Sequence, residues 1–258
     1  MNIIDTQVSS ENWRGVFREF ENIYPWSSKI SKIIWRGALS EAEWRDALTS
    51  VRWRANKAIT NYNLMGSTLY DVGLTGIPRW LTTRVKFNVT EVGGFLPGLK
   101  PMTSFMNYKA ILDMDGNSWS SRFGTLLCYN SLVVKIEPKY FEYFYPELKP
   151  WKHFVPVAND LSDLDTNVRW VLDPNNEQAV KDIIESANDW CSRRILPEEL
   201  ARDQLDIWES YVRQLNRGDS KWHEQLQTVK DDLFKRRDFN YTNLSILKRL
   251  KEHEAVQY

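Results

Sequence analysis

The sequence predicts an α/β fold with a mainly parallel sheet flanked by helices. Four short apolar runs, at residues 32–36, 108–112, 131–136 and 153–157, have the length and composition of buried strands. Stretches with helical spacing alternate with them, which favours strand–helix–strand units. The chain has 258 residues, enough for one large domain or one and a half. Of these residues 42% are hydrophobic and 26% charged, as in an ordinary globular chain.

The central unit is the stretch "LDMDGNSWSSRFGTLLCYNSLVV", Leu112 to Val134. "YKAIL" before it and "SLVVKI" at its end are predicted strands, and "SSRFGTLLCYN" is a predicted short helix with Ser120 or Ser121 as its cap. Asp115-Gly116 is a typical turn dipeptide. We expect Cys128, in the apolar run of that helix, to be a buried thiol.

A second strand–loop–helix unit precedes it. The strand at residues 32–36 leads into a loop with Arg36 and Gly37, and Ser40 with Glu43 forms a capping box. A helix should therefore begin at about Glu41 and carry Arg45 in its first turns. Residues 9–24 predict another helix.

The remaining chain divides by composition. Residues 68–104 contain many glycines and are interpreted as loops around one strand, "RVKFNV" (84–89). Residues 175–195 and 197–215 predict helices, the second with Pro197 in its first turn. We expect three regions: an N-terminal helix and linker (1–28), a ligand-binding domain (29–218) and a charged peripheral tail (219–258).

Ligands of parallel α/β sheets bind beyond the carboxyl ends of the strands. The loops after Ile34 and Leu112 both lie there, each with an arginine and the start of a helix. Guanidinium groups bind phosphate oxygens in a fork, so the two loops form a candidate diphosphate clamp. A surface salt bridge is the alternative for any single arginine.

Other functional classes are disfavoured. Lys+Arg and Asp+Glu both total 34, which argues against a general nucleic-acid binder. The spacing of His and Cys matches no zinc site, and no run of eighteen apolar residues predicts a membrane span. Asp113 and Asp115 form an Asp-x-Asp pattern that could hold a metal, but the turn interpretation is favoured. His153 fits a nucleotide or sugar contact as well as a core position.

Several segments together resemble glycosyltransferase family 90, which includes protein O-glucosyltransferases and related xylosyltransferases. The matching pieces are "WRG" at 35–37, "RD" at 45–46, "YK" at 108–109, "DGNSWSSRF" at 115–123 and the long run "SLVVKIEPKYFEYFYPELKPWKHFVPVANDLSDL" at 131–164. The resemblance implies a Rossmann-like UDP-sugar-binding domain of a GT-B enzyme. It implies inverting transfer of glucose or xylose from a UDP-sugar to a protein or glycan hydroxyl, with no metal required.

The resemblance also implies donor-binding residues. They are Trp35, Arg36 and Gly37 in the first loop, Arg45 after it, and Gly116, Ser120 and Arg122 in the second loop. The family's general base is an Asp in an amino-terminal domain, and residues 1–34 hold no match to its motif. The catalytic residue is therefore unassigned, and we expect a chain truncated at its N-terminus. The alternative function is a non-catalytic UDP-sugar-binding domain.

The resemblance implies a location in the lumen of the secretory pathway, the endoplasmic reticulum or Golgi. The first fifteen residues lack the basic start and apolar core of a signal peptide. The sugar and the acceptor are not fixed by the sequence.

Overall fold

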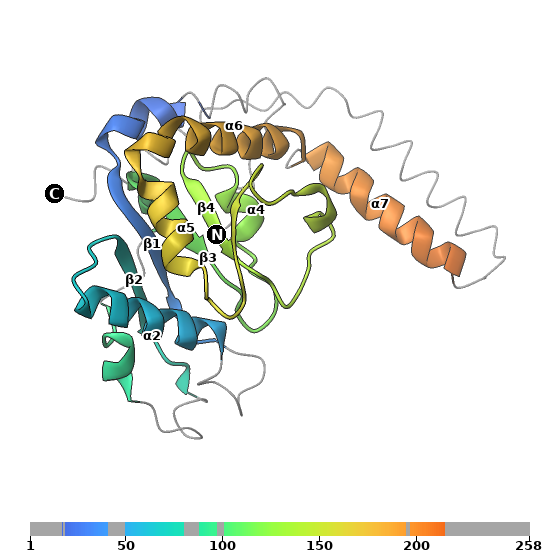
Figure 1. Cartoon of the computed structure of the whole chain (residues 1–258). Helices are drawn as coiled ribbons and strands as arrows, with labels where there is room; N and C mark the ends of the chain where they lie inside the picture. Colours follow the sequence, from blue (N-terminus) through green and yellow to red (C-terminus); the bar gives the residue numbers. More distant parts are fainter. Residues whose placement is uncertain are drawn as a thin grey trace. The chain divides into compact units, whose positions relative to one another are not determined.

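A computed structural model describes residues 17, 19–40, 50–79, 88–96, 101–194 and 197–214. One compact unit spans Phe17–Asp189, and the described part of a second unit begins at Trp190 and ends with the last helix. The first unit contains a five-stranded parallel sheet (Figure 1). Its strands are β1 (Ile30–Ala38), β2 (Tyr70–Gly76), β3 (Tyr108–Asp113), β4 (Leu132–Ile136) and β5 (Val155–Val157).

The α-helices are α2 (Val51–Leu64), α4 (Phe123–Leu126), α5 (Leu164–Leu172), α6 (Glu177–Arg194) and α7 (Pro197–Gln214). Short 3₁₀ helices are η1 (Trp26–Ser28), η3 (Val89–Val92), η4 (Met102–Asn107), η5 (Tyr145–Glu147) and η6 (Pro174–Asn176). The α/β class predicted from the sequence is confirmed. None of the helices in the described ranges is long and apolar enough to span a membrane.

The strand order is β2-β1-β3-β4-β5. The chain moves outward from β1 to β2 on one side, then returns across β1 to place β3 on the other. In open parallel sheets this reversal opens a crevice at the carboxyl ends of the two central strands. The point of reversal in this sheet lies between the carboxyl ends of β1 and β3, and we refer to it as the β1/β3 crevice.

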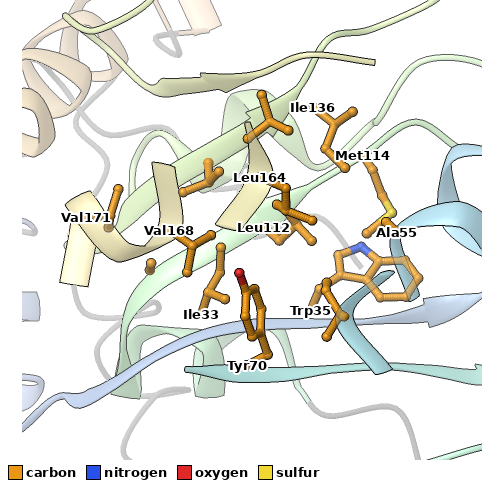
Figure 2. Packing of buried hydrophobic residues seen from close by; sticks show 14 of the residues in the cluster. Ile33, Trp35, Ala55, Tyr70, Leu112, Met114, Ile136, Leu164, Val168 and Val171 are labelled. Carbon is orange, nitrogen blue, oxygen red and sulfur yellow. The ribbon is translucent and has the colours of Figure 1, made fainter. Parts of the chain in front are cut away.

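One face of the sheet is apolar along its length. Alternate residues of the strands, among them Ile33, Leu112 and Ile136, gather with side chains of α2, α5 and α6 in one buried cluster (Figure 2). Helix α5 packs against β1, β3 and β5, and supplies Leu164 and Val168 to this cluster. Burial of these apolar side chains is the main force that holds the layers together.

The opposite face changes character along the strands. Ile34, Ile111 and Val133 are buried neighbours, paired by the sheet register. Two residues later the same strands present Arg36, Asp113 and Lys135, all with 6% exposure or less. Because side chains alternate along a strand, this face carries buried charges at its carboxyl end. The charges lie next to the crevice.

Strand β2 corrects the prediction that residues 68–104 are loops around one strand. In β2, Tyr70 and Leu74 reach the apolar cluster, which is the alternation expected of a strand. Gly73 weakens the alternation of apolar and polar residues by which a strand is recognised in the sequence. A Cβ at this position would lie 2.3 Å from Leu96 Cδ1. The glycine is therefore needed for close packing. Of the predicted strand "RVKFNV", Arg84–Phe87 lie outside the described residues, and Val89 begins η3.

Two predictions about the central helix are wrong. Helix α4 is one turn long and begins after Arg122, and neither Ser120 nor Ser121 caps it with its side chain. Ser120 Oγ instead donates to Asp113 Oδ1 at 2.5 Å. Cys128 is not a thiol, because Cys128 and Cys191 are both disulfide-bonded.

The remaining elements lie close to their predicted bounds. β1, β3, β4 and β5 overlap the four predicted strands, and α6 and α7 match the two predicted C-terminal helices. The capping box at Ser40 points to residues 41–49, which lie outside the described residues. The described start of α2 is capped by Ser50, whose side chain accepts from the Trp53 amide.

Candidate functional site

The loops that follow β1 and β3 meet at the crevice. Arg122, at the start of α4, donates from Nη1 to the carbonyl oxygen of Arg36 at 2.9 Å. This bond joins the second predicted ligand loop to the first across 86 residues of sequence. The structure thus brings together Arg36, Gly37, Gly116 and Arg122, which the sequence assigned to two separate loops.

Arg52, on the first turn of α2, ties the same two loops. Its Nη1 donates to the Ala38 carbonyl at 2.7 Å and to Ser40 Oγ at 2.6 Å, and its Nε donates to the Asp115 carbonyl at 2.7 Å. Sequence reasoning missed Arg52. The signal that would have found it is the Ser50 cap, because a helix begun at Ser50 puts residue 52 in its first turn.

The Trp35 ring lies against the guanidinium groups of Arg52 and Arg122. Its indole is fully buried, with the Arg52 guanidinium 5.4 Å and the Arg122 guanidinium 5.9 Å from its ring. A cation over an indole face is attracted by the ring quadrupole. Trp35 is therefore placed to hold both guanidinium groups at the crevice, and it is not itself exposed to a ligand.

Two glycines allow the backbone to pack closely here. A Cβ at Gly116 would lie 2.9 Å from Arg52 Nη2 and 3.0 Å from Ser40 Oγ. A Cβ at Gly37 would lie 2.8 Å from the Trp35 ring. Both predicted glycine positions are thus close-packed points of the crevice.

Asp113 and Asp115 are occupied by a lysine of the neighbouring strand. Lys135 Nζ lies 2.9 Å from a carboxylate oxygen of each aspartate, and all three side chains are buried. The Lys139 and Tyr140 amides also donate to Asp115. The turn interpretation of the Asp-x-Asp pattern agrees with this geometry. Within the described ranges no cluster of three or more His, Cys, Asp or Glu side chains has metal-binding geometry.

The Arg36 side chain is engaged by the neighbouring strand β2. Its guanidinium pairs with the Asp71 carboxylate of β2 and donates to the carbonyl oxygens of Trp35 and Asp71. Tyr108 donates to the other carboxylate oxygen of Asp71. Arg36 therefore contributes its backbone carbonyl to the contact between the two loops, while the Asp71 carboxylate of β2 neutralises its charge.

A cavity of about 690 Å³ opens beyond the ends of β4 and β5. It is lined by Lys135, Glu137, Pro138, Phe141, Glu142, Tyr143, Tyr145, Pro146, Leu148, Pro150, Phe154, Pro156, Val157 and Ala158. Phe141 and Tyr143 are exposed. Cavities of this size with mostly apolar walls and few polar groups are typical small-molecule sites.

Glu142 is one of several titratable groups of this cavity whose pKa is strongly shifted. Burial raises its pKa to about 7, and the nearby Asp113 and Asp115 carboxylates contribute to the rise, while Lys135 opposes it. Perturbed carboxyl groups in cavities are a feature of functional sites. Sequence reasoning missed Glu142, because the cavity forms only when the segment after β4 folds beside β5.

Arg45 and His153 are the two remaining candidate residues from the sequence. Arg45 lies outside the described residues. His153 is buried, and its Nδ1 accepts a hydrogen bond from the Lys149 amide at 2.9 Å. That bond requires an unprotonated Nδ1 and stabilises the turn before β5, which favours the core role for His153.

The sequence profile of glycosyl transferase family 90 matches residues 7–245. Protein O-glucosyltransferase 3 of Rattus norvegicus is 36% identical over 111 residues, which cover 43% of this chain and 20% of that protein. Protein O-glucosyltransferase 2 of Danio rerio is 30% identical over 133 residues, 50% of this chain and 26% of that protein. Protein O-glucosyltransferase 1 of Rattus norvegicus is 41% identical over 64 residues, 25% of this chain and 16% of that protein.

The matched segments thus span about a quarter or less of these relatives. The family match itself extends over most of the chain and includes both crevice loops and the cavity. This chain therefore belongs to glycosyl transferase family 90.

Proposed function

We propose that this chain supplies the donor-binding site of a UDP-sugar-dependent glycosyltransferase of the GT-B type. The observation that carries the proposal is the convergence of Arg52 and Arg122 on the β1/β3 crevice of a family 90 chain. A crevice at that place in a parallel sheet suits a nucleotide, and guanidinium groups suit its diphosphate. The donor sugar is glucose or xylose, and the acceptor is a protein or glycan hydroxyl.

The reaction needs charge stabilisation at the leaving group. The acceptor oxygen attacks the anomeric carbon from the face opposite UDP, and the bond from that carbon to the β-phosphate oxygen breaks with its electron pair leaving on UDP. Inversion follows from attack at the opposite face. Arg52 and Arg122 stabilise the negative charge that develops on the diphosphate, so no metal ion is required. The acceptor proton passes to a general base, which we leave unassigned.

The secretory-pathway lumen is the proposed location. Disulfide bonds persist in oxidising compartments, and Cys128 and Cys191 are both disulfide-bonded. The relatives that match this chain are protein O-glucosyltransferases, which supports a protein hydroxyl as the acceptor.

A mass-spectrometric screen tests the proposed transfer. The purified chain is incubated with UDP-glucose or UDP-xylose and a set of peptide and glycan acceptors, and both sugar hydrolysis and transfer are measured. Transfer from one UDP-sugar supports the enzyme. Binding of UDP-sugar without transfer supports the alternative, a donor-binding domain that does not catalyse. A chain that neither binds nor transfers any UDP-sugar contradicts both.

A further inference from the structure

We propose that Asn88, which directly precedes η3, is a site of N-linked glycosylation. Residues 88–90 have the sequence Asn-Val-Thr, the acceptor pattern Asn-x-Thr with a residue other than proline in the middle. Asn88 belongs neither to the loops that meet at the crevice nor to the cavity lining. The inference therefore adds a covalent site on the surface and does not depend on donor binding. It shares with the proposed function only the location in the secretory-pathway lumen.

The acceptor pattern lies on the surface of the protein. Asn88 and Thr90 are both exposed, and Val89 between them is partly buried. An N-linked glycan is bulky and hydrated, so it requires an exposed asparagine. A three-residue pattern arises often by chance, but here both of its functional side chains are open to an enzyme.

Thr90 holds the Asn88 side chain in one orientation. Thr90 donates from Oγ1 to Asn88 Oδ1 at 2.7 Å, and its backbone amide donates to the same oxygen at 3.3 Å. Asparagine side chains commonly accept such bonds from the residue two positions on. The Asn88 Nδ2 group, the atom to be modified, forms no hydrogen bond with any residue in the described ranges. The hydroxyl that the pattern requires therefore contacts the amide group that would react.

The modification is a group transfer from a lipid-linked oligosaccharide. Asn88 Nδ2 forms a bond to the anomeric carbon of the oligosaccharide. The bond from that carbon to the lipid diphosphate breaks, and its electron pair leaves on the diphosphate. One Nδ2 proton passes to a base of the transferring enzyme, an oligosaccharyl transferase of the same lumen. Disulfide bonds persist in this compartment, and Cys128 and Cys191 are both disulfide-bonded, so the oxidised cysteines support the same location.

The local fold is compatible with a glycan on Asn88. The transfer replaces one hydrogen of Nδ2, whereas both bonds from Thr90 end on Oδ1 and remain possible afterwards. The helix η3 packs against α2, where Lys57 Nζ lies 2.6 Å from Glu91 Oε2. None of these contacts uses Nδ2. The folded chain can therefore carry the glycan without losing them.

The test measures glycan occupancy at residue 88 by peptide mass spectrometry. The full chain is directed into the endoplasmic reticulum of cultured cells by a cleavable signal sequence, and both secreted and retained material are collected. A peptide N-glycosidase acting in water labelled with heavy oxygen converts each glycosylated asparagine into a labelled aspartate. We expect the label at residue 88 in most molecules. The measurement must resolve single sites, because Asn240 and Asn243 begin the same pattern outside the described residues.

Three variants isolate the role of the pattern. Thr90→Val keeps the bulk of the side chain but removes its hydroxyl, and the label at residue 88 should fall to background. Thr90→Ser restores a hydroxyl and should restore the label. Asn63→Gln changes an exposed asparagine that begins no such pattern, so it should leave occupancy at Asn88 unchanged.

Two results overturn the proposal. The first is an unlabelled Asn88 in the wild-type chain recovered from the lumen, whether secreted or retained. The second is equal labelling in the wild type and in Thr90→Val, which would show that the label does not depend on the acceptor pattern. Neither result bears on the crevice, since UDP binding is measured separately on the same purified protein. A failure of the glycosylation site and a failure of the proposed donor site are therefore distinguishable.

Discussion

Lys135 carries the positive charge that two buried carboxylates require. Removing one partner from a buried ion pair leaves an uncompensated charge and typically costs about 3–5 kcal/mol. We expect Lys135→Met to lower the free energy of unfolding by about that amount, measured by chemical denaturation. Lys181→Met is the control, because its partly exposed pair with Glu177 is worth about 1 kcal/mol or less. Equal effects of the two changes would contradict the role of Lys135.

We propose that Arg122 contributes to diphosphate binding. We expect Arg122→Ala to weaken UDP binding by about 1.5–3 kcal/mol, the usual scale for a lost charged hydrogen bond. Arg169→Ala is the matched control, since this exposed arginine of α5 pairs with Asp165 on the same helix. Calorimetry with UDP decides the point. Unchanged UDP affinity in folded Arg122→Ala would remove this arginine from the site.

At the scale of elements, β2 depends on the absence of a side chain at Gly73. A Cβ there would lie 2.3 Å from Leu96 Cδ1, whereas one at Gly76 would have no heavy atom within 4 Å. Overpacking of this kind costs about 1–3 kcal/mol. Gly73→Ala should destabilise the fold by that amount in denaturant titrations, and Gly76→Ala should destabilise it less.

The clash at Gly73 also predicts a rescue. Leu96→Ala removes the side chain that the new methyl group of Gly73→Ala would strike. The two changes together should therefore cost less than the sum of their separate effects. Additive effects would show that the Leu96 side chain is not what excludes a Cβ at this position.

The start of β1 gives a pH-dependent prediction. Lys29 is buried and donates to the Met106 carbonyl and to Ser131 Oγ. Burial lowers the Lys29 pKa to about 8, although Glu21 raises it. Since the unfolded chain holds this proton up to about pH 10.4, the unfolded state binds more protons between pH 8 and 10.4. Stability from this group therefore rises with pH across that window, by about 2–3 kcal/mol at most.

Denaturation from pH 7.5 to 10 measures this rise. Lys29→Met should lack the Lys29 part of the pH dependence, and Lys57→Met, at a position that pairs on the surface with Glu91, should retain it. The same pH slope in Lys29→Met and the wild type would contradict a lowered pKa at Lys29.

Sequence patterns identify elements whose signal is local. β1, β3 and β4 are apolar runs buried on both faces, so composition alone reveals them. β2 lies at the sheet edge and contains two glycines, which weaken its alternation. Ser120 was predicted as a helix cap because the sequence does not show that Asp113 competes for its hydroxyl.

At the scale of the whole molecule, the parts of the site that depend on local sequence are likewise the ones that could be predicted. The convergence of the loops after β1 and β3 was predictable, because loops after parallel strands converge at one edge. Arg52 and Glu142 were not predictable, since one depends on where α2 begins and the other on a cavity built from two separate segments. Long-range packing, which spacing in sequence does not encode, decides both.

We propose that the crevice between the ends of β1 and β3 binds the diphosphate of the donor. Competition calorimetry on the 258-residue chain, with UDP, UDP-glucose and free glucose, tests it most directly. We expect UDP and UDP-glucose to bind with similar affinity and free glucose to bind far more weakly, because the arginines act on the phosphates. Equal competition by UDP and free glucose, or no UDP binding by the folded chain, would contradict it.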